Sequence, residues 1–135
     1  MRELKVDATL DSLQKVTDFV DEELETAGCP ADMKTKIDIA IDEIFGNIVR
    51  YAYGGDEGSA AVRVDSESAP GAIILTFLDS GAPFNPLLRE DPDTTLSASD
   101  RKIGGLGIFM VKKLMDEVLY EYKDGQNILT LRKWL

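Results

Sequence analysis

The clearest pattern in the sequence is DMKTKIDIAIDEIFGNIVRY, residues 32–51. Its apolar residues recur at intervals of three and four, which predicts an amphipathic helix with one buried stripe. Glu43 and Asn47 lie four residues apart at the border of this stripe, so both side chains project from the same rim of the core. The stripe consists of Ile37, Ala40, Ile41, Ile44, Ile48 and Tyr51, widened by Phe45.

Shorter patterns on either side of this helix predict the rest of the domain. The order is strand, two helices, two strands, helix, two strands, which is typical of an α+β protein. We therefore predict a two-layer α/β sandwich, with a mixed, mostly antiparallel sheet and helices packed on one face. The other predicted elements are a strand at Leu4–Val6, a helix over 10–24 capped by Thr9, strands at 61–64 and 72–79, a helix around 108–115, and strands at 118–123 and 127–134 joined by an Asp124-Gly125 turn.

Length and charge limit the kinds of partner that this chain can bind. We expect its 135 residues to form a single domain, 1–135. With 15 Lys and Arg against 25 Asp and Glu, the net charge is −10. This net charge argues against the basic face that nucleic acid or anionic lipid requires. We therefore expect neither direct binding to nucleic acid nor association with a membrane. Its longest apolar run, 72–78, is far shorter than the ~18 residues of a membrane span. The predicted localisation is cytoplasmic.

The sequence contains no histidine and one cysteine, Cys29. Mechanisms that depend on imidazole, such as serine-histidine-aspartate triads and histidine-bound metals, are therefore excluded. Disulfide frameworks and thiolate zinc sites are excluded by the single thiol. Any catalysis must depend on carboxylates, amides, hydroxyls, lysine or a hard cation such as Mg²⁺.

The first candidate motif is the pair Glu43 and Asn47. The amide oxygen of Asn47 is a suitable neutral ligand for Mg²⁺, whose other ligands would be phosphate oxygens and water. Glu43 could accept a proton from an attacking hydroxyl. The alternative interpretation is a solvated helix face, because Glu and Asn at this spacing are common.

The second motif is Asp79-Ser80-Gly81-Ala82-Pro83-Phe84, at the end of an apolar strand. A carboxylate that leaves a buried strand can accept a hydrogen bond from an exocyclic amine such as that of adenine. Gly81 would let a flat ring approach the backbone. These residue types also form ordinary strand-ending turns, which is the alternative interpretation.

The third motif is Gly104-Gly105-Leu106-Gly107, which begins the last predicted helix after Arg101 and Lys102. Free N–H groups and the helix dipole favour phosphate at such a position. A flexible connection with close helix packing is the alternative. The preceding segment, 80–104, shows no periodicity, and irregular segments of this length are usually functional or mobile.

Together the three motifs resemble the Bergerat-type (GHKL) ATPases, the histidine-kinase-like ATPase superfamily. Glu43-x-x-x-Asn47 resembles the N box of that superfamily, Asp79-x-Gly81 its first glycine box and Gly105-x-Gly107 its second. Within it, the short chain is similar to the RsbW-like anti-sigma-factor serine/threonine kinases. The shared features are Ala52-Tyr53 after the N box, Gly104–Gly107 and Met115-Asp116-Glu117.

The resemblance implies roles for individual residues. Asn47 would ligate Mg²⁺, Glu43 would be the general base, and Asp79 would bind the adenine amine while Gly81 makes room for the purine. The segment 80–104 would be the ATP lid. The resemblance also assigns ATP-binding positions to Gly104, Gly105, Leu106 and Gly107 at the phosphates, and to Thr130 near adenine.

The resemblance further implies a Mg-ATP-dependent kinase that phosphorylates an anti-anti-sigma antagonist of STAS type and sequesters a sigma factor. Homodimers are common in the family that it resembles. An alternative function is a regulatory module that binds ATP or ADP with little or no phosphotransfer. A nucleotide-free interaction domain is a third, since each motif alone has a structural explanation.

Overall fold

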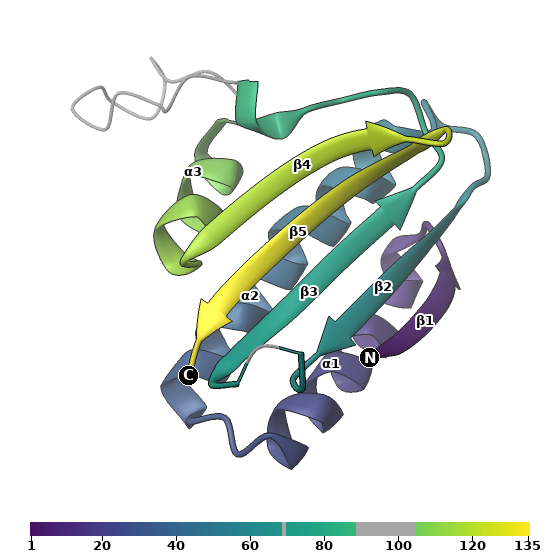
Figure 1. Ribbon diagram of the computed structural model, residues 1–135. Helices are drawn as coiled ribbons and strands as arrows, with labels where there is room; N and C mark the ends of the chain where they lie inside the picture. The colour runs from purple at the N-terminus through teal and green to yellow at the C-terminus, as the bar shows by residue number, and fades with distance from the viewer. Residues whose placement is uncertain (69, 89–104) are drawn as a thin grey trace.

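The computed structural model describes residues 1–68, 70–88 and 105–135. Figure 1 shows a five-stranded sheet with α1 and α2 behind one face and α3 beside β4. The predicted two-layer α+β architecture is confirmed. The elements are β1 (Arg2–Asp7), α1 (Leu13–Thr26), α2 (Ala31–Asn47), β2 (Ser59–Asp65), β3 (Ala72–Asp79), α3 (Gly105–Leu114), β4 (Glu117–Lys123) and β5 (Gln126–Trp134), with 3-10 turns at Leu10–Ser12 and Pro86–Leu88 and a π-helical turn at Ile48–Ala52.

The strand order is β1-β2-β3-β5-β4, and each of the four strand pairs is antiparallel, so the described sheet is antiparallel throughout where a mixed sheet was predicted. The Asp124-Gly125 turn joins β4 and β5 as predicted. Both residues have positive φ, 53° and 77°, which the tight two-residue hairpin requires. The central strand β3 pairs with β5, and this register sets Asp79 opposite Asn127.

The core lies between the sheet and the three helices. Alternate residues of β2, β3 and β5 face the helices, as the period-two patterning of half-buried strands requires. The buried apolar side chains include Val16, Val20, Leu24, Ile37, Ile41, Phe45, Val62, Val64, Ile73, Leu75, Phe77, Val111 and Leu131. No described helix has the length and apolar character of a transmembrane span.

The first helix begins later than predicted. Residues Leu10–Ser12 form a 3-10 turn, and α1 starts at Leu13. The Thr9 side chain makes no capping bond to the backbone; its Oγ1 lies 3.2 Å from the Ser12 Oγ instead. Thr9 therefore precedes the 3-10 turn and does not cap the α-helix.

The helix predicted over 32–51 is present in two parts. It is α-helical to Asn47 and continues as a π-helical turn from Ile48 to Ala52. Single π turns inside helices are rare and are frequent at functional sites. At the end of this turn, the Ala52 carbonyl accepts a hydrogen bond from the Ala82 N–H at 3.0 Å.

Two carboxylates face each other between α1 and α2. Lys34 Nζ lies 3.4 Å from Asp21 Oδ2 and 4.0 Å from Asp38 Oδ2. Within the described residues, Asp21 Oδ1 and Asp38 Oδ1 are buried without a hydrogen-bond partner. Burial, the hydrogen bond that a protonated Asp38 can donate to Asp21, and the Asp21 charge raise the pKa of Asp38 to about 7, and Asp42 adds a smaller repulsion.

This pair predicts a pH-dependent stability. Because the pKa of Asp38 is raised above its unfolded value, its contribution to stability is present in acid and is lost as pH rises from about 4 through 7. Asp38→Asn keeps a donor toward Asp21 at every pH. We expect urea unfolding at pH 5 to give similar midpoints for both proteins and at pH 8 a higher midpoint for the variant. If the two urea midpoints differed by the same amount at pH 5 and at pH 8, the proposed proton between Asp38 and Asp21 would be contradicted.

Candidate nucleotide site

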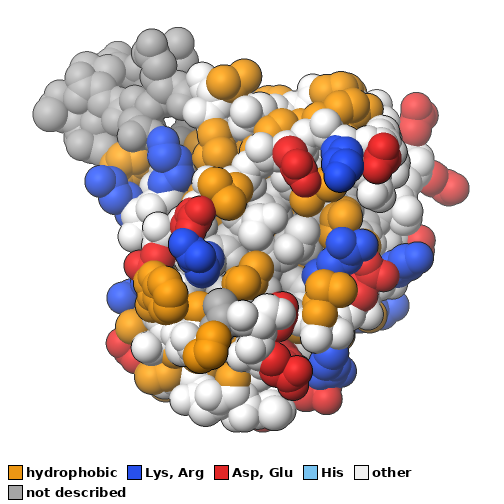
Figure 2. All heavy atoms as spheres, in the orientation of Figure 1, with side chains coloured by type: hydrophobic (Ala, Val, Ile, Leu, Met, Phe, Trp, Pro, Cys, Tyr) orange, Lys and Arg blue, Asp and Glu red, His pale blue; other side chains and the backbone are white. Residues whose placement is uncertain are grey.

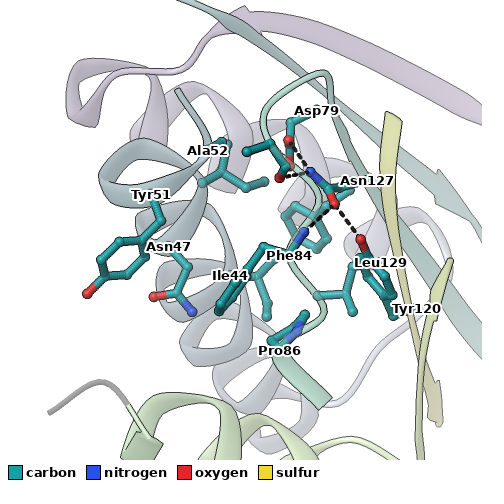
Figure 3. Close-up of a pocket in the computed structure, with 13 residues that line it drawn as sticks. Ile44, Asn47, Tyr51, Ala52, Asp79, Phe84, Pro86, Tyr120, Asn127 and Leu129 are labelled. Atoms are coloured by element: carbon teal, nitrogen blue, oxygen red, sulfur yellow. Dashed lines mark hydrogen bonds between the residues drawn. The ribbon is translucent and has the colours of Figure 1, made fainter. Parts of the chain in front are cut away.

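A pocket opens between the end of α2 and the inner face of the sheet (Figure 3). It encloses about 500 Å³, part of it open to solvent. Apolar side chains form most of its wall, and a few polar groups converge on it, which is the usual composition of a small-molecule site. The lining residues are Ile44, Asn47, Ile48, Tyr51, Ala52, Phe77, Asp79, Ala82, Phe84, Pro86, Tyr120, Asn127 and Leu129.

The helical wall carries Asn47 and Tyr51, one turn apart (Figure 3). The Asn47 Oδ1 accepts a hydrogen bond from Arg50 Nη2 at 3.0 Å. This amide oxygen is the predicted metal ligand. Because like charges repel, the exposed Arg50 guanidinium would have to move away from this oxygen for a divalent cation to bind it.

The sheet wall carries Asp79 at the end of β3. Its side chain is 7% exposed, and its Oδ1 accepts hydrogen bonds from the Gly81 N–H at 3.0 Å and from Asn127 Nδ2 at 2.9 Å. Within the described part of the chain, both recorded bonds use the same carboxylate oxygen. The second oxygen, Oδ2, is therefore the atom of Asp79 available to accept a bond from a ligand.

Gly81 has a structural role different from the one predicted. A Cβ at this position would lie 2.0 Å from the Ala52 carbonyl oxygen, so the glycine allows the chain after β3 to contact the end of the π-helical turn. Gly81 does not line the pocket, although its neighbour Ala82 does. Its effect on a purine remains a prediction, and the observed contact shows that it shapes the pocket through Ala52.

Glu43 lies one turn before Asn47 on α2, next to the first turn of α3. A Cβ on Gly107 would lie 2.1 Å from Glu43 Oε2, so the carboxylate occupies the space that a side chain there would fill. Glu43 is partly buried and does not line the pocket itself. The structure thus brings together the predicted base and the start of the glycine-bearing helix.

The other predicted phosphate-binding positions are described in part. Gly105, Leu106 and Gly107 form the first turn of α3. Gly104, Arg101 and Lys102 lie outside the described residues. Of the predicted lid, 80–104, only residues 80–88 are described.

Thr130, which the resemblance places near adenine, lies outside the pocket that Asp79 lines. Thr130 pairs with Thr76 on β3 and lines a shallow hollow with Ile74, Leu119 and Arg132. This hollow is on the open face of the sheet, which Figure 2 shows from the side opposite the helices. Side chains alternate between faces along a strand, and the buried Leu129 and Leu131 show that odd-numbered β5 residues face the helices. Thr130 therefore points away from the pocket.

The β5 residue that does reach the pocket is Asn127, which the sequence analysis did not identify. It is 7% exposed and makes hydrogen bonds to Asp79, Ala82, Phe84 and Tyr120. The sequence did offer one indication of this position. Side chains alternate between the two faces of a strand, so Asn127 shares the buried face of β5 with Leu129 and Leu131. An amide at a core position of a strand is unusual and needs partners.

The available protein ligands suit a magnesium ion that is coordinated mainly by phosphate oxygens. Among the described residues, no group of three or more His, Cys, Asp or Glu side chains could hold a metal ion. Asn47 offers a single neutral oxygen, and Mg²⁺ is commonly bound by few protein ligands together with substrate phosphates and water. The residues present therefore suit Mg²⁺ that arrives with a nucleotide.

These features define a two-layer α+β domain with a ligand pocket between a helix and the sheet. The family model described as histidine kinase-like ATPase domain matches residues 6–133, and the chain belongs to this family.

Several relatives in this family are named as kinases. The chain is 28% identical over 101 residues to the serine/threonine-protein kinase BtrW of Bordetella bronchiseptica, covering 75% of this chain and 70% of that protein. It is 26% identical over 143 residues to the serine-protein kinase RsbW of Staphylococcus aureus strain JH9, covering 98% and 86%. The predicted similarity to RsbW-like serine/threonine kinases is confirmed.

A solved structure has the same fold. The crystal structure of the RsbU and RsbW domains of Rv1364c from Mycobacterium tuberculosis matches with a TM-score of 0.64 at 20% identity. The match covers 100% of this chain and 33% of that longer chain, and it supports the fold.

Proposed function

We propose that this chain is a Mg-ATP-dependent protein serine/threonine kinase whose ATPase domain spans residues 1–135. The observation that carries the proposal is that Asn47 and Asp79 line one largely apolar pocket, while Glu43 lies one turn before Asn47 on α2. Family membership and the named kinases among the relatives support the reaction class.

The adenine ring is proposed to occupy the end of the pocket at Asp79. Ile48, Phe77 and Leu129 offer apolar surface to a flat ring, and the carboxylate offers an acceptor to its exocyclic amine. A bound ring would cover this carboxylate oxygen, and an acceptor that is covered without a donor is costly, so the position favours a ring that presents an N–H there.

The triphosphate is proposed to run along α2 toward α3. Successive turns of an α-helix are about 5.4 Å apart, so Asn47 and Glu43 form a line along α2 that leads away from the adenine end. At the far end of this line, Gly107 contacts Glu43, and the N-terminus of α3 presents free N–H groups. The terminal phosphate would therefore lie near Glu43.

In this arrangement Asn47 would hold Mg²⁺ together with the phosphates. The bound ion supplies positive charge that offsets the charge of the transferring phosphoryl group. Glu43 would orient or deprotonate the acceptor hydroxyl, and the N–H groups of Gly105–Gly107 would bind phosphate oxygens.

The proposed phosphoacceptor is a serine or threonine of a small antagonist protein, an anti-anti-sigma factor of STAS type. In the same proposal the kinase also sequesters a sigma factor, and phosphorylation of the antagonist determines which partner it holds. These partner assignments rest on the resemblance to RsbW-like anti-sigma-factor kinases, while the names of the relatives support the serine kinase activity.

Asn47→Ala should separate metal-dependent from metal-independent binding. We expect calorimetry to give micromolar affinity for ATP and ADP in wild type with Mg²⁺, and the variant to lose about tenfold in affinity together with its Mg²⁺ dependence. Asp42→Asn, an exposed change on the same helix, is the control and should bind as wild type does. Absence of nucleotide binding by folded wild type would refute the proposal.

Transfer of label from γ-labelled ATP to a STAS-type antagonist distinguishes the kinase from a nucleotide-binding regulatory module. In a single turnover, a kinase yields phosphorylated antagonist in proportion to bound ATP. Tight ATP binding with no labelled antagonist and no released phosphate would favour the regulatory module.

A further inference from the structure

The side chain of Asn127 uses its full hydrogen-bonding capacity. Its Nδ2 donates to Asp79 Oδ1 and to the Ala82 carbonyl, both at 2.9 Å. Its Oδ1 accepts from the Phe84 N–H at 3.0 Å and from the Tyr120 hydroxyl at 2.5 Å. Figure 3 shows this network between the sheet and the segment that follows β3.

These four bonds fix the orientation of the amide. A flipped amide would set its oxygen against the Asp79 carboxylate and the Ala82 carbonyl, and its NH₂ against the Phe84 N–H. Three of the four bonds would be lost at a residue that is 7% exposed, where unpaired polar groups are costly. Asn127 therefore has one stable orientation.

That orientation has two consequences for the pocket. It holds the Asp79 side chain in place through Oδ1, with Oδ2 left for a ligand. It also attaches Ala82 and Phe84, which line the pocket, to the start of β5. Since both donors and the acceptor of Asn127 are used, the residue has no hydrogen bond left for a nucleotide.

We propose that Asn127 is a positioning residue for nucleotide recognition, acting through Asp79 and the Ala82–Phe84 backbone. The inference rests on the proposed function, because it assigns the means by which the adenine acceptor is held. It makes affinity for the base depend on a side chain that does not itself bind the base.

Asn127→Asp tests the link to Asp79. The substitution keeps the size of the side chain but places two carboxyl groups at hydrogen-bond distance, where they must share a proton. We expect the ADP dissociation constant of N127D, divided by that of wild type at the same pH, to be at least about tenfold larger at pH 8.5 than at pH 5.5, where the protonated acid can still donate to Asp79 but no longer to Ala82 as well. The ratio cancels the titration of ADP itself. A purely structural defect would weaken binding equally at each pH.

Two further variants keep the test informative. Tyr120→Phe removes one donor to Asn127 Oδ1 and should weaken ADP binding about two- to tenfold at all pH values. Thr76→Val, on β3 but away from the pocket, should leave ADP binding unchanged. If N127D does not fold, a wild-type affinity for Tyr120→Phe overturns the proposal.

Amide hydrogen exchange without nucleotide separates this inference from the proposed function. We expect the Phe84 N–H to be protected in wild type and Thr76→Val and to exchange at least about tenfold faster in Asn127→Ala. If the wild-type protein binds no nucleotide but shows this protection pattern, the proposed nucleotide recognition is refuted. The hydrogen bond between the Phe84 N–H and Asn127 is then still supported. Wild type that binds ADP, with N127D matching it at every pH, overturns the role of Asn127 and leaves the function intact.

Discussion

Glu43→Gln is expected to lower the rate of phosphotransfer by about 10²–10⁴-fold while ATP affinity stays within about twofold of wild type. The amide keeps the size of the carboxylate and its contact with Gly107, but it cannot accept a proton from the phosphoacceptor. Since Glu43 does not line the pocket, removal of its charge should spare binding of the base. Single-turnover transfer from γ-labelled ATP gives the rate, and calorimetry gives the affinity.

Two companion variants show whether position or charge is responsible. Asp42→Asn removes an exposed carboxylate from the same helix and should keep the wild-type rate. Gly107→Ala should slow transfer without unfolding the protein, because its Cβ would displace the flexible end of Glu43. Full activity in Glu43→Gln would eliminate this residue as the base.

Gly81→Ala is expected to destabilise the protein by about 1–3 kcal/mol, the usual cost of overpacking a tight contact. Its Cβ would lie 2.0 Å from the Ala52 carbonyl oxygen, and 2.5 Å from the carbonyl carbon. Both atoms belong to the backbone, so relief requires the π-helical turn and the chain after β3 to move apart. Urea unfolding followed by far-UV circular dichroism measures the loss.

Gly46→Ala is the matched control, because it makes the same chemical change inside α2. Its Cβ would meet the Arg50 guanidinium at 3.3 Å, and this exposed side chain can move. We expect a gain of up to about 1 kcal/mol from helix propensity. Equal effects of the two substitutions would show that the contact with Ala52 is not what makes Gly81 necessary.

Most of the fold was predictable because its elements have strong local patterns. The apolar stripe around Ile41 and Ile44 indicated α2, and Asp124-Gly125 indicated the β4–β5 hairpin. The pairing of β3 with β5 was not predictable, since strands distant in sequence leave no local signal of their partner. The π-helical turn at Ile48–Ala52 also escaped prediction, because it depends on tertiary contacts such as the bond between Ala82 and Ala52.

The site was predicted less completely than the fold. Asn47 and Asp79 line one pocket, and Glu43 contacts Gly107. Thr130 was assigned by resemblance alone, although the alternation of Asn127, Leu129 and Leu131 assigns it to the other face. Asn127 was missed because its importance comes from partners far away in sequence, which composition and spacing do not reveal.

The pairing of β3 with β5 also bears on how this protein gains its ligand during folding. Asp79 and Asn127 are 48 positions apart, and no local segment of the chain contains both. Closing a long-range pair costs chain entropy and slows folding. The pocket therefore exists only after the central strands have joined. A nucleotide that binds the pocket should stabilise the whole folded domain by mass action and should slow its unfolding, while leaving the early steps of folding unchanged.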